Sequence, residues 1–327
     1  MKAGYEVSVL EVAMTLTVNP LGPPSGKGRF AAELLGANLH EPPARDLVDT
    51  FNAAMAGYAV VVLRDQLISD EEQIRFARAF GPLELPPHMG LAAGIKPRIG
   101  FGLYDISNLD AHGDFLPEDS LKHIFNKGNE NFHTDSSFND LPTKWSMLSA
   151  RVIPPQGGDT EFCDARAAFD ALPASLKVRA GTATAEHWLW KTKIAAGYKV
   201  ITDDMRRAMP PARHPVVRTM ENSGRKTLYL GAHATHIVDW SAADSEQFIA
   251  EINAHIARPE FRYVHRWRIG DLVVWDNRCT LHRATQYEVF KYKRDLRRAT
   301  INEYGPEISS TTAIGVAPPK TDAEKRV

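Results

Sequence analysis

A histidine and an aspartate stand two positions apart in the segment NFHTDSSF, residues 131–138. If this segment is extended, His133 and Asp135 project from the same face, because side chains alternate along a strand. One imidazole and one carboxylate on one face can supply two ligands of a facial metal triad. That arrangement suits non-haem Fe(II) and leaves coordination positions open for a co-substrate and oxygen.

The third ligand of such a triad is expected from a distant part of the chain, and the segment WDNRCTLHRA offers His282. A bare histidine–x–aspartate pattern is weak evidence, and the chain has a second one at His112 and Asp114. The second pattern has turn-forming neighbours and no strand pattern, so the first pair is preferred. Without a distal partner, that pair would be read as a turn-capping pair on a surface strand.

Three arginines follow His282 in the segment KRDLRRATI: Arg294, Arg297 and Arg298. A dicarboxylate co-substrate needs a fixed cation at its far end, and a planar guanidinium can bind a carboxylate through two hydrogen bonds. Thr160 could add a hydroxyl donor. These residues therefore predict a carboxylate site near the metal. The alternative is that the arginines pair with acidic residues on a solvated face.

Short apolar segments joined by Gly- and Pro-containing turns must position these residues. Strand patterns occupy residues 30–35, 58–64, 145–153, 160–163, 216–218, 227–230, 262–267, 272–275 and 297–302. Helical patterns occupy 45–55 and 241–257, a capping box at Ser69–Glu72 begins another helix, and Asp164 can cap a short one. These patterns predict a mainly β fold with flanking helices, built on a double-stranded β-helix of the jelly-roll, cupin-like type.

The expected organisation is a flexible leader over residues 1–27, one domain over 28–305 and a tail over 306–327. Residues 84–129 show scattered Pro, Gly, Asp and His without a long periodic run. Such a stretch inside a domain is typical of a lid or binding loop, and this one leads directly into the proposed metal segment.

Composition excludes several classes of protein. The 39 Lys and Arg residues nearly cancel the 40 Asp and Glu residues, so no net positive field attracts nucleic acid or an anionic membrane. The sequence has no apolar run long enough to span a membrane. Cys163 and Cys279 are the only cysteines and lack a CxxC arrangement, which favours buried thiols in a reducing compartment. We therefore expect a cytoplasmic protein of the size of an enzyme. The proposed metal and carboxylate sites, rather than the composition, add an organic acid and O2 as its partners; a homo-oligomer is compatible with this.

Several further segments extend the pattern beyond the three proposed ligands. They are FGPLE at 80–84, GGDTEFCD at 157–164, SGRK at 223–226, GAHATH at 231–236, WDNR at 275–278 and RRAT at 297–300. In these segments, in this order, the chain resembles the taurine dioxygenase/TfdA family of Fe(II)- and 2-oxoglutarate-dependent oxygenases. More narrowly, it is similar to the 2,4-dichlorophenoxyacetate dioxygenases. The resemblance covers residues 63–301.

The resemblance implies that the double-stranded β-helix holds iron through His133, Asp135 and His282. It further implies the following roles: Arg294 and Thr160 bind the distal carboxylate of 2-oxoglutarate, Arg298 meets the acidic end of the primary substrate, and His233 and His236 lie at the substrate pocket. Lys293 is a rival to Arg294, because the spacing from His282 is one residue longer than in some relatives. From the residues alone, His88 and Asn131, with Asn129, are further candidates for the substrate pocket.

The implied reaction is oxidative decarboxylation of 2-oxoglutarate to succinate and CO2, coupled to hydroxylation of a substrate C–H bond. At the carbon beside the ether oxygen of an aryloxyacetate, the product would collapse to a phenol and glyoxylate. Met220 stands where relatives usually have a histidine, which would make the pocket more apolar. The alternatives are a taurine, alkylsulfonate or alkyl sulfate dioxygenase, a non-catalytic cupin-like binding protein, and a zinc hydrolase, since two histidines and an aspartate can also hold zinc.

Overall fold

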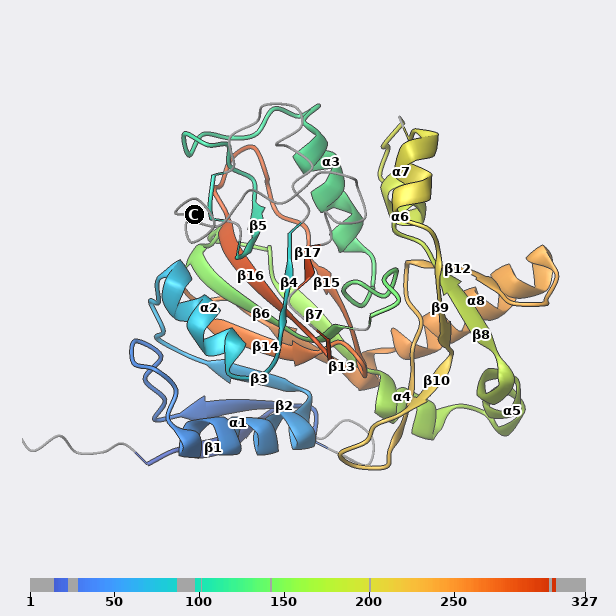
Figure 1. Ribbon diagram of the computed structural model, residues 1–327, viewed down its shortest axis with the longest axis horizontal. Helices are drawn as coiled ribbons and strands as arrows, with labels where there is room; N and C mark the ends of the chain where they lie inside the picture. The colour runs from blue at the N-terminus through green and yellow to red at the C-terminus, as the bar shows by residue number, and fades with distance from the viewer. Residues whose placement is uncertain are drawn as a thin grey trace, which may run out of the picture.

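Strands from distant parts of the chain pair into one large sheet in the order β1-β2-β3-β14-β6-β16-β4-β17, with β5 pairing with β16 (Figure 1). The computed structural model describes residues 15–22, 29–86, 98–100, 102–141, 143–199, 201–305 and 308–309. The strands of the large sheet are β1 (Thr17–Leu21), β2 (Ala31–Leu35), β3 (Val60–Leu63), β4 (Leu83–Leu85), β5 (Tyr104–Ser107), β6 (Thr143–Val152), β14 (Leu272–Asp276), β16 (Asp295–Asn302) and β17 (Ile308–Ser309). The central strands β14, β6 and β16 are antiparallel.

A second, smaller antiparallel sheet packs against the large one. It has the order β13-β7-β15 and consists of β7 (Thr160–Asp164), β13 (Arg262–His265) and β15 (Thr280–Ala284). Phe162 of β7 lies between the sheets, with its ring centroid 5.5 Å from that of Trp275 on β14. Val273 and Trp275 belong to this inner core, whereas Leu272 and Val274 face the opposite side, as strand alternation requires. The predicted mainly β, jelly-roll architecture is therefore confirmed.

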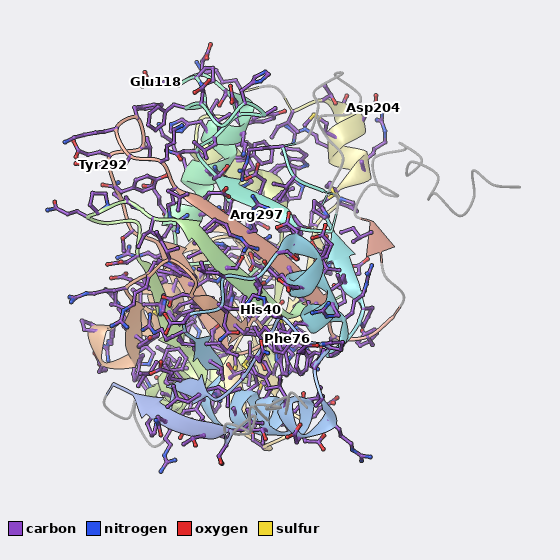
Figure 2. All side chains as sticks on the ribbon, turned by 90° about the vertical axis from the view of Figure 1, so that its left-hand side faces the viewer. His40, Phe76, Glu118, Asp204, Tyr292 and Arg297 are labelled. Atoms are coloured by element: carbon purple, nitrogen blue, oxygen red, sulfur yellow. The ribbon has the colours of Figure 1, made fainter. Side chains whose placement is uncertain are left out.

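Two helices cover the outer face of the large sheet. They are α1 (Arg45–Tyr58) and α2 (Asp70–Arg78), and the predicted capping box of Ser69 and Glu72 is present at the start of α2. Phe51 of α1 contacts Phe76 of α2 edge to face, at a centroid distance of 5.4 Å. Figure 2 shows the side chains around Phe76 that fill this layer. This packing fixes the back of the sheet whose inner face carries the site.

The remaining helices and small sheets surround the jelly roll: most lie beside it, whereas α3 lies above it in the view of Figure 1. They comprise α3 (Leu121–Lys127), η2 (Gly128–Glu130), α4 (Ala165–Ala171), α5 (Ala174–Thr182), β8 (Thr184–His187), α6 (Leu189–Ala195), α7 (Asp203–Ala208), β9 (Ala212–Pro215), β10 (Val217–Thr219), β11 (Lys226–Leu228), β12 (Ala234–Ile237), α8 (Ala242–Ile256) and η3 (Pro259–Phe261). Asp164 caps α4 through the amides of Arg166 and Ala167, as expected. Apolar residues of α4, α5 and α8 share one buried core with β12, which holds these elements together.

The structure differs from the expected organisation in three places. Residues Thr17–Leu21, inside the range expected to be a leader, form a strand that pairs with β2. The range 84–129 contains β5 and α3 in addition to irregular segments, and Ile308–Ser309 of the expected tail pairs with β4. Long-range pairing supplies the hydrogen bonds of these strands, and no local sequence pattern reports such partners. Among the helices of the described ranges, none combines the length and apolar character that a membrane crossing requires.

Candidate active site

His133, Asp135 and His282 meet on the inner side of the small sheet. One nitrogen or oxygen atom from each lies within 4.8 Å of the others, and all three residues are buried. The Asp135 carboxylate lies 3.9 Å from His133 Nε2 and 3.6 Å from His282 Nε2. His282 is on β15, and the backbone of His133 pairs with it as an isolated bridge. The three groups are close enough to hold one metal ion after small side-chain adjustments, which is the geometry of a facial triad.

The expectation that His133 and Asp135 share a strand is wrong. Only His133 makes a β-bridge, and the chain turns at Asp135, where Ser136 has a left-handed φ of 51°. Two distant side chains stabilise this turn. The carboxamide oxygen of Asn277 accepts from the Asp135 amide at 3.1 Å, and the Ser146 hydroxyl donates to the Asp135 carboxylate at 2.6 Å. The turn, rather than strand alternation, brings the carboxylate to the histidines.

Burial keeps both histidines in the form that binds metals. Desolvation lowers the pKa of His282 to about 3, and it also lowers the pKa of His133, so both rings are neutral at pH 7. His133 Nδ1 lies 2.7 Å from the carbonyl oxygen of Asn131, which can only accept. The proton of the neutral ring must therefore be on Nδ1. The lone pair of Nε2 is then free on the side that faces Asp135.

Asp135 is held as a carboxylate. Burial alone would raise its pKa, but Arg298 and the two histidines lower it well below its usual range, as does the hydrogen bond from Ser146. The guanidinium of Arg298 donates a hydrogen bond to the carboxylate from β16. An ionised carboxylate beside two neutral imidazoles is a donor set that suits a divalent cation.

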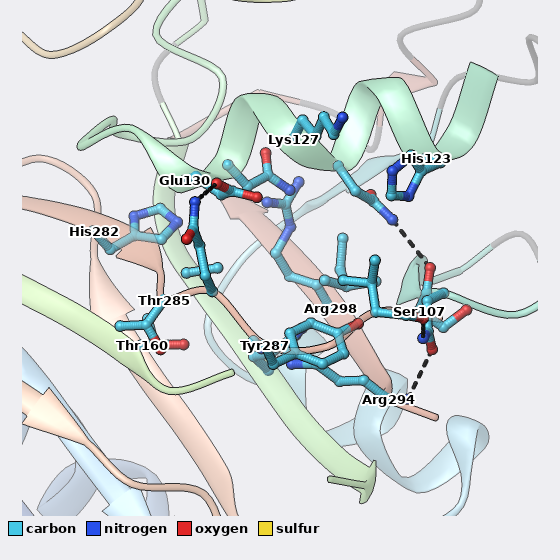
Figure 3. A pocket seen from close by; sticks show the side chains of 18 of the residues that line it. Ser107, His123, Lys127, Glu130, Thr160, His282, Thr285, Tyr287, Arg294 and Arg298 are labelled. Carbon is cyan, nitrogen blue, oxygen red and sulfur yellow. Dashed lines mark hydrogen bonds between the residues drawn. The ribbon is translucent and has the colours of Figure 1, made fainter. Parts of the chain in front are cut away.

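A cavity opens beside the triad. Its described lining comprises Ile106, Ser107, Asn108, His123, Asn126, Lys127, Asn129, Glu130, His133, Leu148, Thr160, Trp275, His282, Ala284, Thr285, Gln286, Tyr287, Val289, Arg294 and Arg298. Figure 3 shows His282 and Thr160 at one side, Tyr287 and Arg294 at the lower side, and Arg298 reaching from its strand toward the helix that carries Lys127. The structure thus brings Thr160, Arg294 and Arg298 into one cavity with the two histidines.

Arg294 lies buried at the base of this cavity. Its backbone amide donates to Asn108 Oδ1 at 2.8 Å, and its Nη2 donates to the carbonyl of Gly158 at 3.1 Å. Its Nε has no partner within the described part of the chain. A buried guanidinium with an unused donor is well suited to a carboxylate ligand. The rival Lys293 is exposed and donates to the carbonyl of Gly113 instead.

The other substrate candidates divide into three groups. His233 is buried beside the triad, with its ring centroid 5.8 Å from that of His133, and Asn129 lines the cavity. His236 is half-buried on β12 and is not among the described lining residues, and Asn131 reaches the site only through its carbonyl. His88 lies outside the described residues. Met220 is buried in the core around Phe162 and does not line the described cavity.

Sequence reasoning missed the residues that position the triad. Ser146 and Asn277 bond each other at 2.9 Å, and each bonds Asp135. Asn277 follows the buried strand β14 and lies in the segment WDNR at 275–278. The appearance of this segment in the sequence pattern was the signal that could have identified Asn277. Ser146 lies in an apolar strand pattern, where a small polar residue is unremarkable. The strand pattern around Ser146 does not indicate which residue the Ser146 side chain faces.

Comparisons with known proteins agree with this geometry. Residues 17–300 match the family model described as "Taurine catabolism dioxygenase TauD, TfdA family". The chain is 41% identical over 291 residues to the alpha-ketoglutarate-dependent 2,4-dichlorophenoxyacetate dioxygenase of Cupriavidus pinatubonensis, covering 88% of this chain and 98% of that protein. It is 34% identical over 269 residues to the (S)-phenoxypropionate/alpha-ketoglutarate-dioxygenase of Sphingobium herbicidovorans, covering 80% and 88% respectively.

A solved structure shares the fold. The crystal structure of AAD-2 in complex with Mn(II) and N-oxalylglycine matches with a TM-score of 0.82 and 38% identity, covering 90% of this chain and all (100%) of that one. N-oxalylglycine is an analogue of 2-oxoglutarate. The relative therefore binds a divalent metal and a 2-oxoglutarate analogue on the same architecture.

Proposed function

The chain belongs to the TauD/TfdA family of dioxygenases, and from this premise we propose that it is an Fe(II)- and 2-oxoglutarate-dependent dioxygenase of an aryloxyacetate-type acid. The observation that carries the proposal is the meeting of His133, Asp135 and His282 beside a cavity that contains buried arginines. The names of the similar proteins support the substrate class. A non-catalytic binding protein and a zinc hydrolase would not be expected in this family.

The two histidines, through Nε2, and the carboxylate of Asp135 would hold the iron. The donor set fits this role because both rings are neutral and the carboxylate is ionised. Bound Fe(II) would activate O2, the oxidant, while 2-oxoglutarate would supply two electrons by losing CO2, so that one atom of O2 enters the succinate and the other is inserted into a substrate C–H bond. The surrounding aromatic wall limits the access of water: the centroid of Trp275 lies 4.7 Å from that of His282.

Arg294 and Thr160 would bind the distal carboxylate of 2-oxoglutarate. Both line the same cavity, and both are buried. Trp267 Nε1 donates to the Thr160 hydroxyl oxygen at 3.1 Å, which leaves the hydroxyl proton available for a carboxylate. A charge-assisted contact from Arg294 in this buried setting would be stronger than one at the surface.

The primary substrate would place its CH2 group, between the ether oxygen and the carboxylate, toward the triad. Hydroxylation of that carbon gives a hemiacetal. Its collapse breaks the bond between this carbon and the ether oxygen, and yields a phenol and glyoxylate. The protein contributes position and charge to this reaction, and Arg298 is a cation in direct contact with Asp135 of the triad.

Product formation tests the proposal directly. The protein is incubated with Fe(II), 2-oxoglutarate and O2, together with 2,4-dichlorophenoxyacetate, taurine or an alkyl sulfate. We expect succinate and the chlorophenol in equal amounts with the first acid, and much less succinate with the other two. Phenol release without 2-oxoglutarate would indicate a hydrolase and refute the proposal, and preferential turnover of taurine or the alkyl sulfate would refute the substrate class.

A further inference from the structure

The guanidinium of Arg298 lies over an aromatic ring from the neighbouring strand. Its central carbon, Cζ, is 4.5 Å from the centre of the Tyr104 ring. Tyr104 on β5 and Arg298 on β16 are directly paired in an antiparallel register, so both side chains leave the same face of the sheet. A guanidinium this close to a ring is attracted by its π electrons. The strand pairing and the ring together therefore fix where the guanidinium lies.

Hydrogen bonds in turn fix the ring of Tyr104. Its hydroxyl donates to Glu84 Oε1 at 2.5 Å. Glu84 on β4 is buried, and its carboxylate also accepts from the hydroxyls of Ser136, at 2.8 Å, and Thr143, at 3.2 Å. A buried carboxylate that accepts from three separate segments has little freedom to move. The ring of Tyr104 is thus anchored through its hydroxyl.

These contacts lead back to Asp135 of the triad. Ser136, which donates to Glu84, is the next residue in the turn, and Arg298 donates to the Asp135 carboxylate. A divalent cation bound by Asp135 would draw on the charge of that carboxylate and weaken its hold on Arg298. The contact with Tyr104 does not depend on a metal. It would therefore keep Arg298 in place when the triad is loaded.

Arg298 keeps N–H donors free for a ligand. It lines the cavity, and Figure 3 shows it reaching from its strand toward the helix that carries Lys127. Its Nη1 bonds Asp135, whereas its Nε is buried and has no partner in the ranges that the structure describes. A second carboxylate in place of the ring would occupy these N–H groups, but an aromatic face attracts a guanidinium without accepting a directed hydrogen bond from it. Tyr104 thus holds the cation and leaves its donors unused.

We propose that Tyr104 is a positioning residue for Arg298: its ring holds the guanidinium in place, so that the unused donors are preorganised for the carboxylate of the primary substrate. This inference rests on the proposed function, in which that substrate is an aryloxyacetate-type acid. Tyr104 is not among the described lining residues of the cavity, so it acts through Arg298 and not by touching the ligand. The structural alternative is that Tyr104 only fills space between β5 and β4.

The test measures binding to protein loaded with Mn(II) and N-oxalylglycine, which cannot turn over. Calorimetric titration with 2,4-dichlorophenoxyacetate and with its methyl ester compares wild type, Tyr104→Phe, Tyr104→Leu and Tyr304→Leu. Loss of one partly buried cation–π contact should weaken the affinity of Tyr104→Leu for the acid roughly threefold to thirtyfold. Tyr104→Phe keeps the ring and should stay close to wild type. Tyr304 is 61% exposed, so Tyr304→Leu is the matched control and should bind like wild type.

The methyl ester separates positioning of a cation from packing. It lacks the charge that Arg298 would meet, so we expect it to bind wild type and Tyr104→Leu equally. An equal loss of affinity for acid and ester would overturn the inference. An unchanged affinity of Tyr104→Leu for the acid, or a loss in Tyr104→Phe as large as that in Tyr104→Leu, would overturn it as well.

Steady-state kinetics supply a second readout. We expect the KM for the acid to rise in Tyr104→Leu by a factor similar to that of the dissociation constant, while kcat changes little. If Tyr104→Leu does not fold, Tyr104→Met replaces the ring by a flexible apolar side chain that adapts to the same space. If the wild type itself neither binds nor oxidises the acid, the proposed function fails, and this inference fails with it.

Discussion

The backbones of His133 and His282 exchange two hydrogen bonds, with N–O distances of 3.0 Å from His133 to His282 and 2.8 Å in the opposite direction. The pair joins the turn after η2 to strand β15, and it brings the two ring centroids to 4.3 Å. The spacing of the two imidazoles is therefore set by main-chain hydrogen bonds that do not depend on either side chain. Replacing one ring should disturb the chemistry more than the fold.

We expect His133→Ala and His282→Ala to abolish 2-oxoglutarate-dependent turnover while the protein stays folded, because each removes a proposed metal ligand and leaves the backbone bridge in place. Two measurements would show this. The Fe(II)/2-oxoglutarate absorption band should be absent under anaerobic conditions, and the melting temperature should stay near that of wild type. His112→Ala, in the other histidine–x–aspartate pattern, is the matched control, since His112 is exposed in a turn. Wild-type rates in either ligand variant would contradict the assignment.

Gly231→Ala is expected to weaken metal binding and to destabilise the protein by roughly 1–3 kcal/mol. A Cβ at this position would lie 3.2 Å from the Cα of His133, and the φ of +121° is unfavourable for any L side chain. Urea unfolding and Mn(II) titration measure the two effects. Gly57→Ala is the control, because this helical glycine has no atom within 4 Å of an added Cβ. Wild-type Mn(II) affinity in Gly231→Ala would show that this contact does not position His133.

Arg294→Lys should raise the KM for 2-oxoglutarate by roughly tenfold to a hundredfold, because an ammonium cannot reproduce the two-pronged contact of a guanidinium with a carboxylate. Initial rates at saturating aryloxyacetate measure this constant. Lys293→Ala tests the neighbouring cation. The Lys293 ammonium donates to the Gly113 carbonyl at 2.6 Å and does not line the described cavity, so this variant should leave the KM for 2-oxoglutarate unchanged. A reversed ranking of the two variants would transfer the proposed role to Lys293.

Stability should fall as the pH drops from 6.5 toward 3. Burial lowers the pKa of His187 to about 3, below the value of about 6.5 in the unfolded chain. Between these values the unfolded state binds a proton that the folded state does not, so the free energy of unfolding rises with pH. Urea unfolding at pH 7.5 and at pH 5.5 measures this effect. The fall in the free energy of unfolding between the two pH values should be about 1 kcal/mol smaller in His187→Gln than in wild type. Equal losses in both proteins would refute a contribution from His187.

The sequence by itself determined the local elements and the chemistry available to them. The capping box of Ser69 and Glu72 and the cap at Asp164 are where their patterns predict them, because each uses hydrogen bonds within three residues. The buried strand β3 follows from a run of β-branched residues in the same way. Imidazole, carboxylate and guanidinium groups are likewise readable as ligand types before their positions are known.

Tertiary structure decided how those groups meet. Asp135 reaches the histidines through a turn stabilised by Ser146 of β6 and by Asn277, which follows β14. Lys193, on a helix that no sequence pattern singled out, reaches the carbonyl of Phe125 on α3 only because α6 packs against the neighbouring η2. Hydrogen bonds and charges between distant segments depend on how sheets and helices pack, and side-chain periodicity reports the face a residue occupies but not its partner.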